Sequence, residues 1–478
     1  MRNRSNHSHF LRLGFARLAL VLLMIPASAW PLLAEESEDG ECLTLKRIFD
    51  SSEFTPKSLG SPLWLKDRAA YTVLEKDDWN EEQDDEKDDE ETKEEDKDSD
   101  DRRERGVVRY EAESGAREVL VPARLLIPSG ESSPLTIDGY AWSDDGSKLL
   151  ITTNSKRVWR KNTLCDYWVL DVSARELRKL GGSAAPSSTM FAKFSPDGRQ
   201  VAYVCENNIY VEDLGERRIT QLTDNGSDIV INGTFDWVYE EELGLRDGIR
   251  WSPDSRRIAY WQLNSEGVRE IYLINHTDSV YPQLKTIKYP KVGERNSASR
   301  VGVVNAQGGE TLWLDVPGDP RNHYIARMDW AKSSEEIVIQ QLNRLQNTNR
   351  VMLADAGTGR LRTILTERDD AWVELHGDIR WIDDDKEFLW LSERDGWQHA
   401  YIVSRSGENV RLVTPGGYDV TGLCAVDEAS KWLYFMASPD NPSQRYLYRV
   451  RLDGSDAQRV TPADQSGTHS YQISDDTR

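Results

Sequence analysis

The chain has 478 residues, of which 82 are acidic and 60 are basic, so its formal net charge is −22. This length exceeds one ordinary core and predicts either roughly two to four domains or one large repeat architecture. The excess of acid argues against a nucleic-acid partner, because phosphate binding needs a basic face.

The first residues resemble a targeting segment. Four arginines from Arg2 to Arg17 accompany the apolar run LALVLLMIPASAW, and small residues follow. This is the pattern of a secretory signal peptide, and the run is short for a membrane span. We expect residues 1–34 to be the signal peptide and residues 35–61 a lead-in segment. The protein is then exported, periplasmic or extracellular, with membrane association through an uncleaved signal as the alternative.

Residues 76–105 are dominated by acid. Such a segment buries too little apolar surface to offset its ordering entropy, which predicts a disordered insertion. Strand-like sequence on both sides, AAYTVLE and GVVRYEA, indicates an insertion inside one unit. Weak calcium binding and an acidic docking element are the alternatives.

The four cysteines are Cys42, Cys165, Cys205 and Cys424. Three full pairings can form, and sequence cannot choose between them. We expect buried apolar thiols. No CxxC or HxxxH spacing occurs, so the sequence predicts neither a metal site nor another cofactor.

A phrase of strand, polar turn and strand recurs along the chain. Its clear copies are AWSDDGSKLLITT, KFSPDGRQVAYV and RWSPDSRRIAYW. The eight copies begin at Pro62, Ala141, Lys193, Arg250, Met328, Ile379, Cys424 and Tyr471. Ser, Pro, Asp and Gly form the turns, and alternating or apolar runs form the strands.

Repeated units of short antiparallel strands predict an all-β fold, an eight-bladed β-propeller over residues 62–478. A pair of β-sandwiches is the alternative. The last copy stops at Arg478 after one strand and a turn. We therefore expect a truncated eighth blade.

The stretch DWVYEEE interrupts the strand pattern between the third and fourth copies. Asp236 can cap a short helix that starts with Trp237, Val238 and Tyr239. The adjacent Glu240, Glu241 and Glu242 then fall in its first two turns, where the helix dipole favours negative charge. Adjacent carboxylates can converge on one protonated amine inserted between them. The alternative is a helix start with an exposed acidic face.

A second motif is the dipeptide Trp159-Arg160, which stands in a predicted strand pair. Arginine is a planar cation that can fork onto a carbonyl or a carboxylate. The alternative is a surface charge on an edge strand.

Three features together make the chain similar to the dipeptidyl peptidase IV family of prolyl oligopeptidase-like serine peptidases. They are WVYEEE beside a propeller phrase, the earlier WR, and YPKVGERN from Tyr289 to Asn296. In that family an eight-bladed propeller caps an α/β-hydrolase domain. The resemblance implies that Glu241 and Glu242 bind the free N-terminal amine of a peptide substrate, and that Arg160 orients its carbonyl. Supporting places fall to Glu240, Asp236, Trp159 and Tyr239.

The nucleophile motif of the family, G-x-S-x-G followed by Asp and His, does not occur in the chain. We therefore assign no catalytic residue and expect the α/β-hydrolase domain to be absent from this chain, which should be inactive alone. The resemblance implies the substrate-selecting propeller of an exported dipeptidyl peptidase that releases Xaa-Pro or Xaa-Ala dipeptides. It also implies a homodimer of the full-length form. The alternatives are a non-catalytic propeller that binds free N-termini or an envelope protein, and a scaffold that docks through the acidic insertion.

Overall fold

The computed structural model describes residues 43–51, 53–55, 60–66, 68–76, 105–377, 379–474 and 477. The predicted signal peptide, Cys42 and nearly all of the acidic insertion lie outside these residues. The chain divides into two units, Met1–Ser58 and Leu59–Arg478. In the first, helix α1 (Leu45–Phe49) is capped by Thr44. Within the described ranges no helix has the length and apolarity to cross a membrane.

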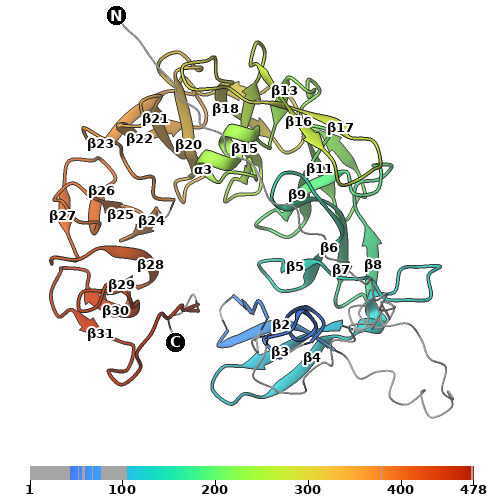
Figure 1. Ribbon diagram of the computed structural model, residues 1–478, viewed down its shortest axis with the longest axis horizontal. Helices are drawn as coiled ribbons and strands as arrows, with labels where there is room; N and C mark the ends of the chain where they lie inside the picture. The colour runs from blue at the N-terminus through green and yellow to red at the C-terminus, as the bar shows by residue number, and fades with distance from the viewer. Residues whose placement is uncertain are drawn as a thin grey trace, which may run out of the picture. The chain divides into compact units, whose positions relative to one another are not determined.

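The second unit consists of antiparallel sheets that succeed one another in chain order (Figure 1). The first sheet contains β1 (Leu63–Trp64), β2 (Ala70–Lys76), β3 (Arg105–Glu111) and β4 (Arg117–Val121), and the short helix η3 (Ala123–Leu126) follows it. Lys76 and Arg105 are register partners, so the acidic segment connects two paired strands of one sheet.

The next eight strands form two four-stranded runs. They are β5 (Gly139–Trp142), β6 (Lys148–Arg157), β7 (Asn162–Asp171), β8 (Glu176–Lys179), β9 (Thr189–Phe194), β10 (Gln200–Cys205), β11 (Asn208–Asp213) and β12 (Ile219–Gln221). A single bridge between Cys165 of β7 and Thr189 of β9 joins the two runs into one sheet.

The following sheet is irregular and carries the motif region. It contains β13 (Val230–Asn232), β14 (Ile249–Trp251), β15 (Arg257–Asn264), β18 (Ala298–Asn305) and β19 (Leu312–Trp313). Helix α3 (Trp237–Leu243) lies between β13 and β14 in sequence, and β16 (Glu270–Asn275) pairs with β17 (Gln283–Lys288) as a separate hairpin.

Three regular four-stranded sheets complete the described chain. They contain β20 (His323–Trp330), β21 (Glu336–Asn343), β22 (Thr348–Asp355) and β23 (Leu361–Arg368); β24 (Arg380–Ile382), β25 (Glu387–Ser392), β26 (His399–Ser404) and β27 (Val410–Leu412); and β28 (Val420–Asp427), β29 (Trp432–Ala437), β30 (Tyr446–Arg451) and β31 (Gln458–Arg459).

Neighbouring sheets pack on one another through buried apolar clusters. One cluster joins β15 and β18 to β20–β22 around Trp261, which is fully buried. Others join β10 and β11 to β14 and β15, β21 and β22 to β25, and β25 and β26 to β28–β30. The apolar positions of each strand therefore face the next sheet, as stacked propeller sheets require.

The propeller class predicted from the repeats is confirmed, but the count of eight blades is not. Seven of the predicted copies form adjacent paired strands, and they lie in six sheets because the second and third copies share the eight-stranded sheet. The eighth begins at Tyr471, and no strand contains that residue or the other described residues after it. Of the cysteines, Cys165 is buried, Cys205 and Cys424 are half-buried, and all three are free.

Candidate functional site

Helix α3 sits on a segment that leaves a sheet and returns to it. The strands β13 and β14 pair with successive parts of the same strand, β15, so together they occupy one strand position. The chain departs at Gly233 and returns at Gly248, whose N–H donates to the Gly233 carbonyl (3.0 Å). A Cβ on Gly248 would lie 2.8 Å from the Gly233 carbonyl carbon, so only glycine fits. The sheet thereby fixes both ends of the segment that presents the acidic motif.

Asp236 caps α3, as the sequence predicts. Its Oδ1 accepts from the Tyr239 N–H (3.1 Å), and its Oδ2 accepts from the Ser297 hydroxyl (2.6 Å). Burial raises the pKa of Asp236, while these hydrogen bonds act in the opposite direction. The helix ends at Gly244, which adopts the left-handed conformation (φ 66°) typical of a helix C-terminus.

Aromatic side chains hold the helix against its surroundings. Tyr239 is buried, stacks on Phe235 (ring centroids 5.5 Å apart), and accepts from the Ile325 N–H of β20 (3.2 Å). Trp237 packs on Tyr289 of the YPKVGERN segment, with ring centroids 4.2 Å apart. The Tyr239 side chain thus fixes α3 to the next sheet.

The three glutamates have three different environments. The Glu240 side chain is only 6% exposed, and its Oε1 accepts from Arg246 Nε (3.0 Å). Glu241 is 14% exposed and pairs with Arg160, whose Nε lies 2.7 Å from Oε2. Glu242 is exposed and makes no ion pair with another described residue.

The turn between β6 and β7 carries the second motif. It places the Arg160 guanidinium, which is 73% exposed, on Glu241, although the two residues are 81 positions apart. Lys285 of the hairpin strand β17 lies over the ring of Trp159, with Nζ 5.6 Å from the ring centroid. The structure therefore brings Arg160, Glu241 and Trp159 together with one end of the hairpin.

This arrangement can bind a cation and an adjacent carbonyl. Glu242 offers a carboxylate that has no ion-pair partner within the described part of the chain. Glu241 shares its charge with an exposed guanidinium that can also donate to a further oxygen. Glu240 is excluded from contact with a ligand by its burial, and it serves to position the helix.

Sequence reasoning missed two residues that shape this site, Arg246 and Ser297. Arg246 neutralises Glu240, and Ser297 donates to the capping aspartate. Neither residue belongs to a motif that the sequence displays. Ser297 does follow the YPKVGERN segment directly, and this proximity is the single signal that could have found it.

Residues 143–478 match the family described as "Dipeptidyl peptidase IV (DPP IV) N-terminal region". The chain belongs to this family. The similarity inferred from the motifs is thereby confirmed, and the family's propeller region accounts for the repeated sheets.

Curated relatives of this chain are longer proteins. "Probable dipeptidyl-aminopeptidase B" of Emericella nidulans is 29% identical over 360 residues, which are 70% of this chain and 40% of that protein. The protein of the same name from Neurospora crassa is also 29% identical, with 39% of its length covered. The chain thus spans about two-fifths of the length of these relatives.

Solved structures show the same fold. The crystal structure of Porphyromonas gingivalis dipeptidyl peptidase 4 superposes with a TM-score of 0.76 at 26% identity, over 91% of this chain and 57% of that one. A putative dipeptidyl aminopeptidase IV from Bacteroides ovatus gives a TM-score of 0.67 at 17% identity, over 88% of this chain and 55% of that one.

Proposed function

We propose that this chain is the substrate-selecting propeller of an exported serine dipeptidyl peptidase that releases Xaa-Pro or Xaa-Ala dipeptides from peptides. One observation carries the proposal. A guanidinium from one sheet, Arg160, lies 2.7 Å from Glu241 on a helix held by another sheet. The next residue of that helix, Glu242, is exposed and has no ion-pair partner among the described residues.

In the proposed complex the free N-terminal amine of the substrate inserts between two carboxylates. A protonated amine donates charge-assisted hydrogen bonds to Glu241 and Glu242, and Arg160 donates to the first carbonyl of the peptide. An acylated or chain-internal amide carries no cation and leaves the carboxylates without this partner. Because α3 is fixed at both ends, Glu241 and Glu242 hold the free N-terminus at a constant distance from the bond that is cut.

Bond cleavage itself belongs to the α/β-hydrolase domain that the family resemblance implies for the longer protein. There the acyl group passes to a serine, and water then releases the dipeptide. The residues of this chain bind and orient the substrate. We assign no residue of this chain as the nucleophile of that step.

The test is peptide binding to the purified chain. We expect a Gly-Pro-containing tripeptide with a free amine to bind, and its N-acetylated form to bind at least about tenfold more weakly, since a charge-assisted hydrogen bond is lost. Glu242→Gln should reduce binding of the free-amine peptide by a similar factor. Glu310→Gln is the matched control, because Glu310 is exposed and far from α3 in sequence.

Equal affinity for the free and acetylated peptides would exclude an amine site. Binding that depends on the amine, combined with no dipeptide release by the longer protein, would instead favour a non-catalytic module that binds N-termini. The first outcome therefore excludes both functions that bind a free N-terminus, and the second distinguishes between them.

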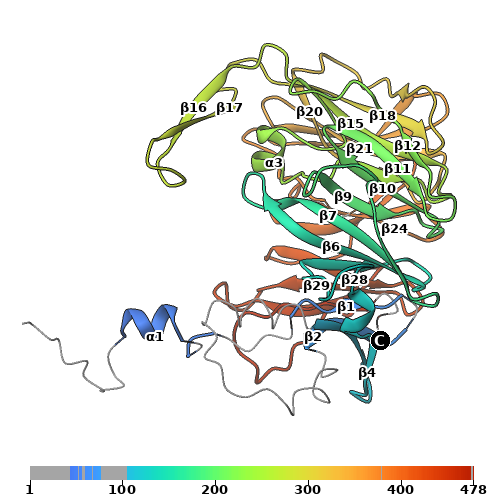
Figure 2. The same ribbon diagram turned by 90° about the vertical axis from the view of Figure 1, so that its right-hand side faces the viewer.

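A second part of the proposal concerns the hairpin β16–β17 and the assembly of the exported protein. The hairpin β16–β17 extends away from the sheets (Figure 2) and exposes large apolar side chains. They are Tyr272 (63% exposed), Tyr281 (83%), Val280 (97%) and Leu284 (69%). We propose that this surface is covered in a homodimer of the exported protein. Sedimentation of the full-length form should give a dimer, and Tyr281→Lys with Leu284→Lys should give a monomer.

A further inference from the structure

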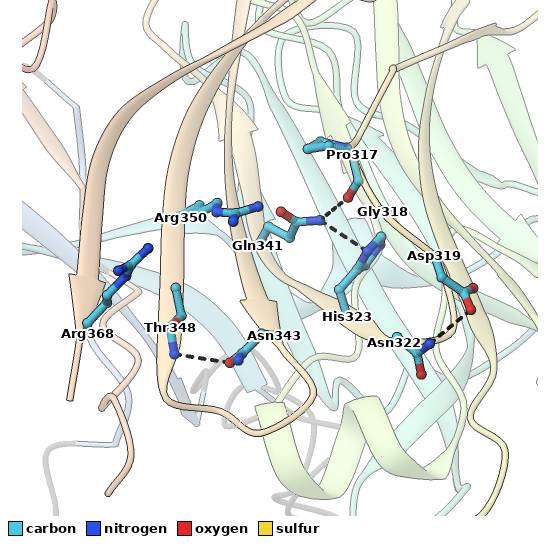
Figure 3. Close-up of a pocket in the computed structure, with 10 residues that line it drawn as sticks. All are labelled: Pro317, Gly318, Asp319, Asn322, His323, Gln341, Asn343, Thr348, Arg350 and Arg368. Atoms are coloured by element: carbon cyan, nitrogen blue, oxygen red, sulfur yellow. Dashed lines mark hydrogen bonds between the residues drawn. The ribbon is translucent and has the colours of Figure 1, made fainter. Parts of the chain in front are cut away.

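A pocket of about 240 Å³ lies at one end of the sheet β20–β23 (Figure 3). The start of β20, the end of β21, the start of β22 and the end of β23 line it, together with the segment that precedes β20. No residue of α3 lines this pocket. It therefore offers a site beyond the proposed peptide anchor.

The strand register places the polar side chains of this pocket on one face. His323, Asn343, Thr348 and Arg368 come from four adjacent strands, with His323 opposite Asn343 and Thr348 opposite Arg368. Arg350 lies two residues after Thr348 and opposite Gln341. Arg350 and Arg368 are thus diagonal neighbours, a relation that sets residues about 7–8 Å apart in an antiparallel pair.

The two guanidiniums are exposed and have no partner among the residues that the structure describes. Within the described chain neither Arg350 nor Arg368 makes a side-chain hydrogen bond or an ion pair. The nearby carboxylate of Asp319 is occupied by Asn322 Nδ2 (3.0 Å) and by the Arg321 N–H (2.9 Å). The pocket therefore holds two guanidiniums against one carboxylate, and neither guanidinium pairs with an acid among the described residues. In a chain with a net charge of −22, this local excess of positive charge favours an anion.

The inner wall of the pocket is rigid and uncharged. Gln341, 5% exposed, donates through Nε2 to the Pro317 carbonyl (2.6 Å) and lies 3.1 Å from Nδ1 of His323. Because the amide nitrogen is a donor, Nδ1 of the histidine accepts. Burial lowers the pKa of His323, which keeps the ring neutral near pH 7. The positive charge of the pocket therefore comes from Arg350 and Arg368.

We propose that this pocket binds a divalent tetrahedral oxyanion of the phosphate class. Two guanidiniums each present a planar fork of donors that matches adjacent oxygens, and the Thr348 side chain lies on the same face. A divalent anion neutralises both cations, whereas a carboxylate carries one charge and two oxygens. The shared chemistry covers free inorganic phosphate and the phosphate group of a phosphomonoester.

The experiment is calorimetric titration of the purified chain with inorganic phosphate at constant ionic strength, with glycerol 2-phosphate and acetate as parallel ligands. We expect saturable binding of phosphate and weaker or no binding of acetate. Comparable binding of glycerol 2-phosphate indicates a phosphomonoester as the source. Binding of inorganic phosphate alone indicates the free ion.

Variants separate the pocket from general electrostatics. Arg350→Gln with Arg368→Gln should weaken phosphate binding at least about tenfold, and Arg350→Lys should weaken it less, since charge remains while the fork is lost. Arg256→Gln is the control, because Arg256 is an exposed arginine on the turn between β14 and β15. Both altered residues are exposed, so a cooperative melting transition at a temperature no lower than that of the wild type confirms folding. Absence of saturable binding, or equal loss in the control, overturns the proposal.

Discussion

Helix α3 and the arginine pocket on β20–β23 both gather like charges, but they treat them differently. On α3 two of three carboxylates have internal partners, Arg246 and Arg160. In the pocket both Arg350 and Arg368 lack one among the described residues. The helix leaves one carboxylate available next to an ion pair that a ligand can share, whereas the pocket leaves both of its guanidiniums available to a ligand. The ion pairs within the protein thus determine how many charged side chains each site leaves available to a ligand.

The largest expected effect compares the two ion pairs of α3. Arg246→Met leaves Glu240 buried without a partner and should lower the free energy of unfolding by about 3 kcal/mol. Arg160→Met removes a pair whose cation is 73% exposed, and should cost less than about 1 kcal/mol. The midpoint of urea unfolding measures both. Equal losses would show that burial does not distinguish the pairs.

A smaller effect is expected at the start of α3. Asp236→Ala removes the cap and the acceptor of Ser297, and should lower the free energy of unfolding by about 1 kcal/mol. Asp236→Asn keeps a capping oxygen and should lose much less. The same urea unfolding measurement decides, and similar losses for the two variants would mean that the cap contributes little.

The pH dependence of stability provides a third comparison. The folded-state pKa of Asp236 is raised by burial, so the folded chain binds this proton more tightly than the unfolded chain. Its contribution to stability is therefore greatest below the unfolded pKa, about 3.9, and falls as pH rises through the raised folded pKa. The wild type should lose stability relative to Asp236→Asn across this window. A constant difference between the two proteins from pH 3 to pH 7 would contradict the assignment.

The smallest effect belongs to the arginine pocket without ligand. Arg350→Gln with Arg368→Gln relieves repulsion between neighbouring cations and should raise the free energy of unfolding by about 0.2–0.5 kcal/mol. Added phosphate should reverse the order, because it stabilises the wild type by binding. Thermal unfolding with and without phosphate measures the change. If phosphate does not raise the melting temperature of the wild type, the two arginines do not form an anion site, and the comparison with α3 fails.

The sequence predicts those features that residues close together in the chain determine. The strand–turn–strand phrases predict seven strand pairs that the structure contains, and DWVYEEE predicts a capped helix with three glutamates, because turn residues, caps and helix periodicity act over a few positions. It also predicts through family resemblance that Arg160 joins the glutamates, and the structure brings Arg160 to Glu241.

Contacts that the strand register creates are not visible in the sequence. Arg350 and Arg368 are ordinary isolated arginines until β22 and β23 pair. In the sequence, Arg246 looks like a surface charge. In the folded chain it follows the end of α3 and forms an ion pair with the buried Glu240. The number of blades likewise depends on closure of the whole propeller, which local patterns do not contain.

The bridge between β7 and β9 has a consequence for the candidate site. Elsewhere, among the described residues, neighbouring sheets share no strand ladder, but here Cys165 and Thr189 pair directly and the Thr189 hydroxyl donates to the Cys165 carbonyl (2.7 Å). The bridge makes one eight-stranded sheet of two four-stranded runs. Arg160 lies on the turn that leads into β7 of this sheet, whereas α3 lies between two strands of the sheet that follows. The ion pair of Arg160 and Glu241 therefore spans the junction of these two sheets, and any change in how they pack would change the opening between the guanidinium and the carboxylate.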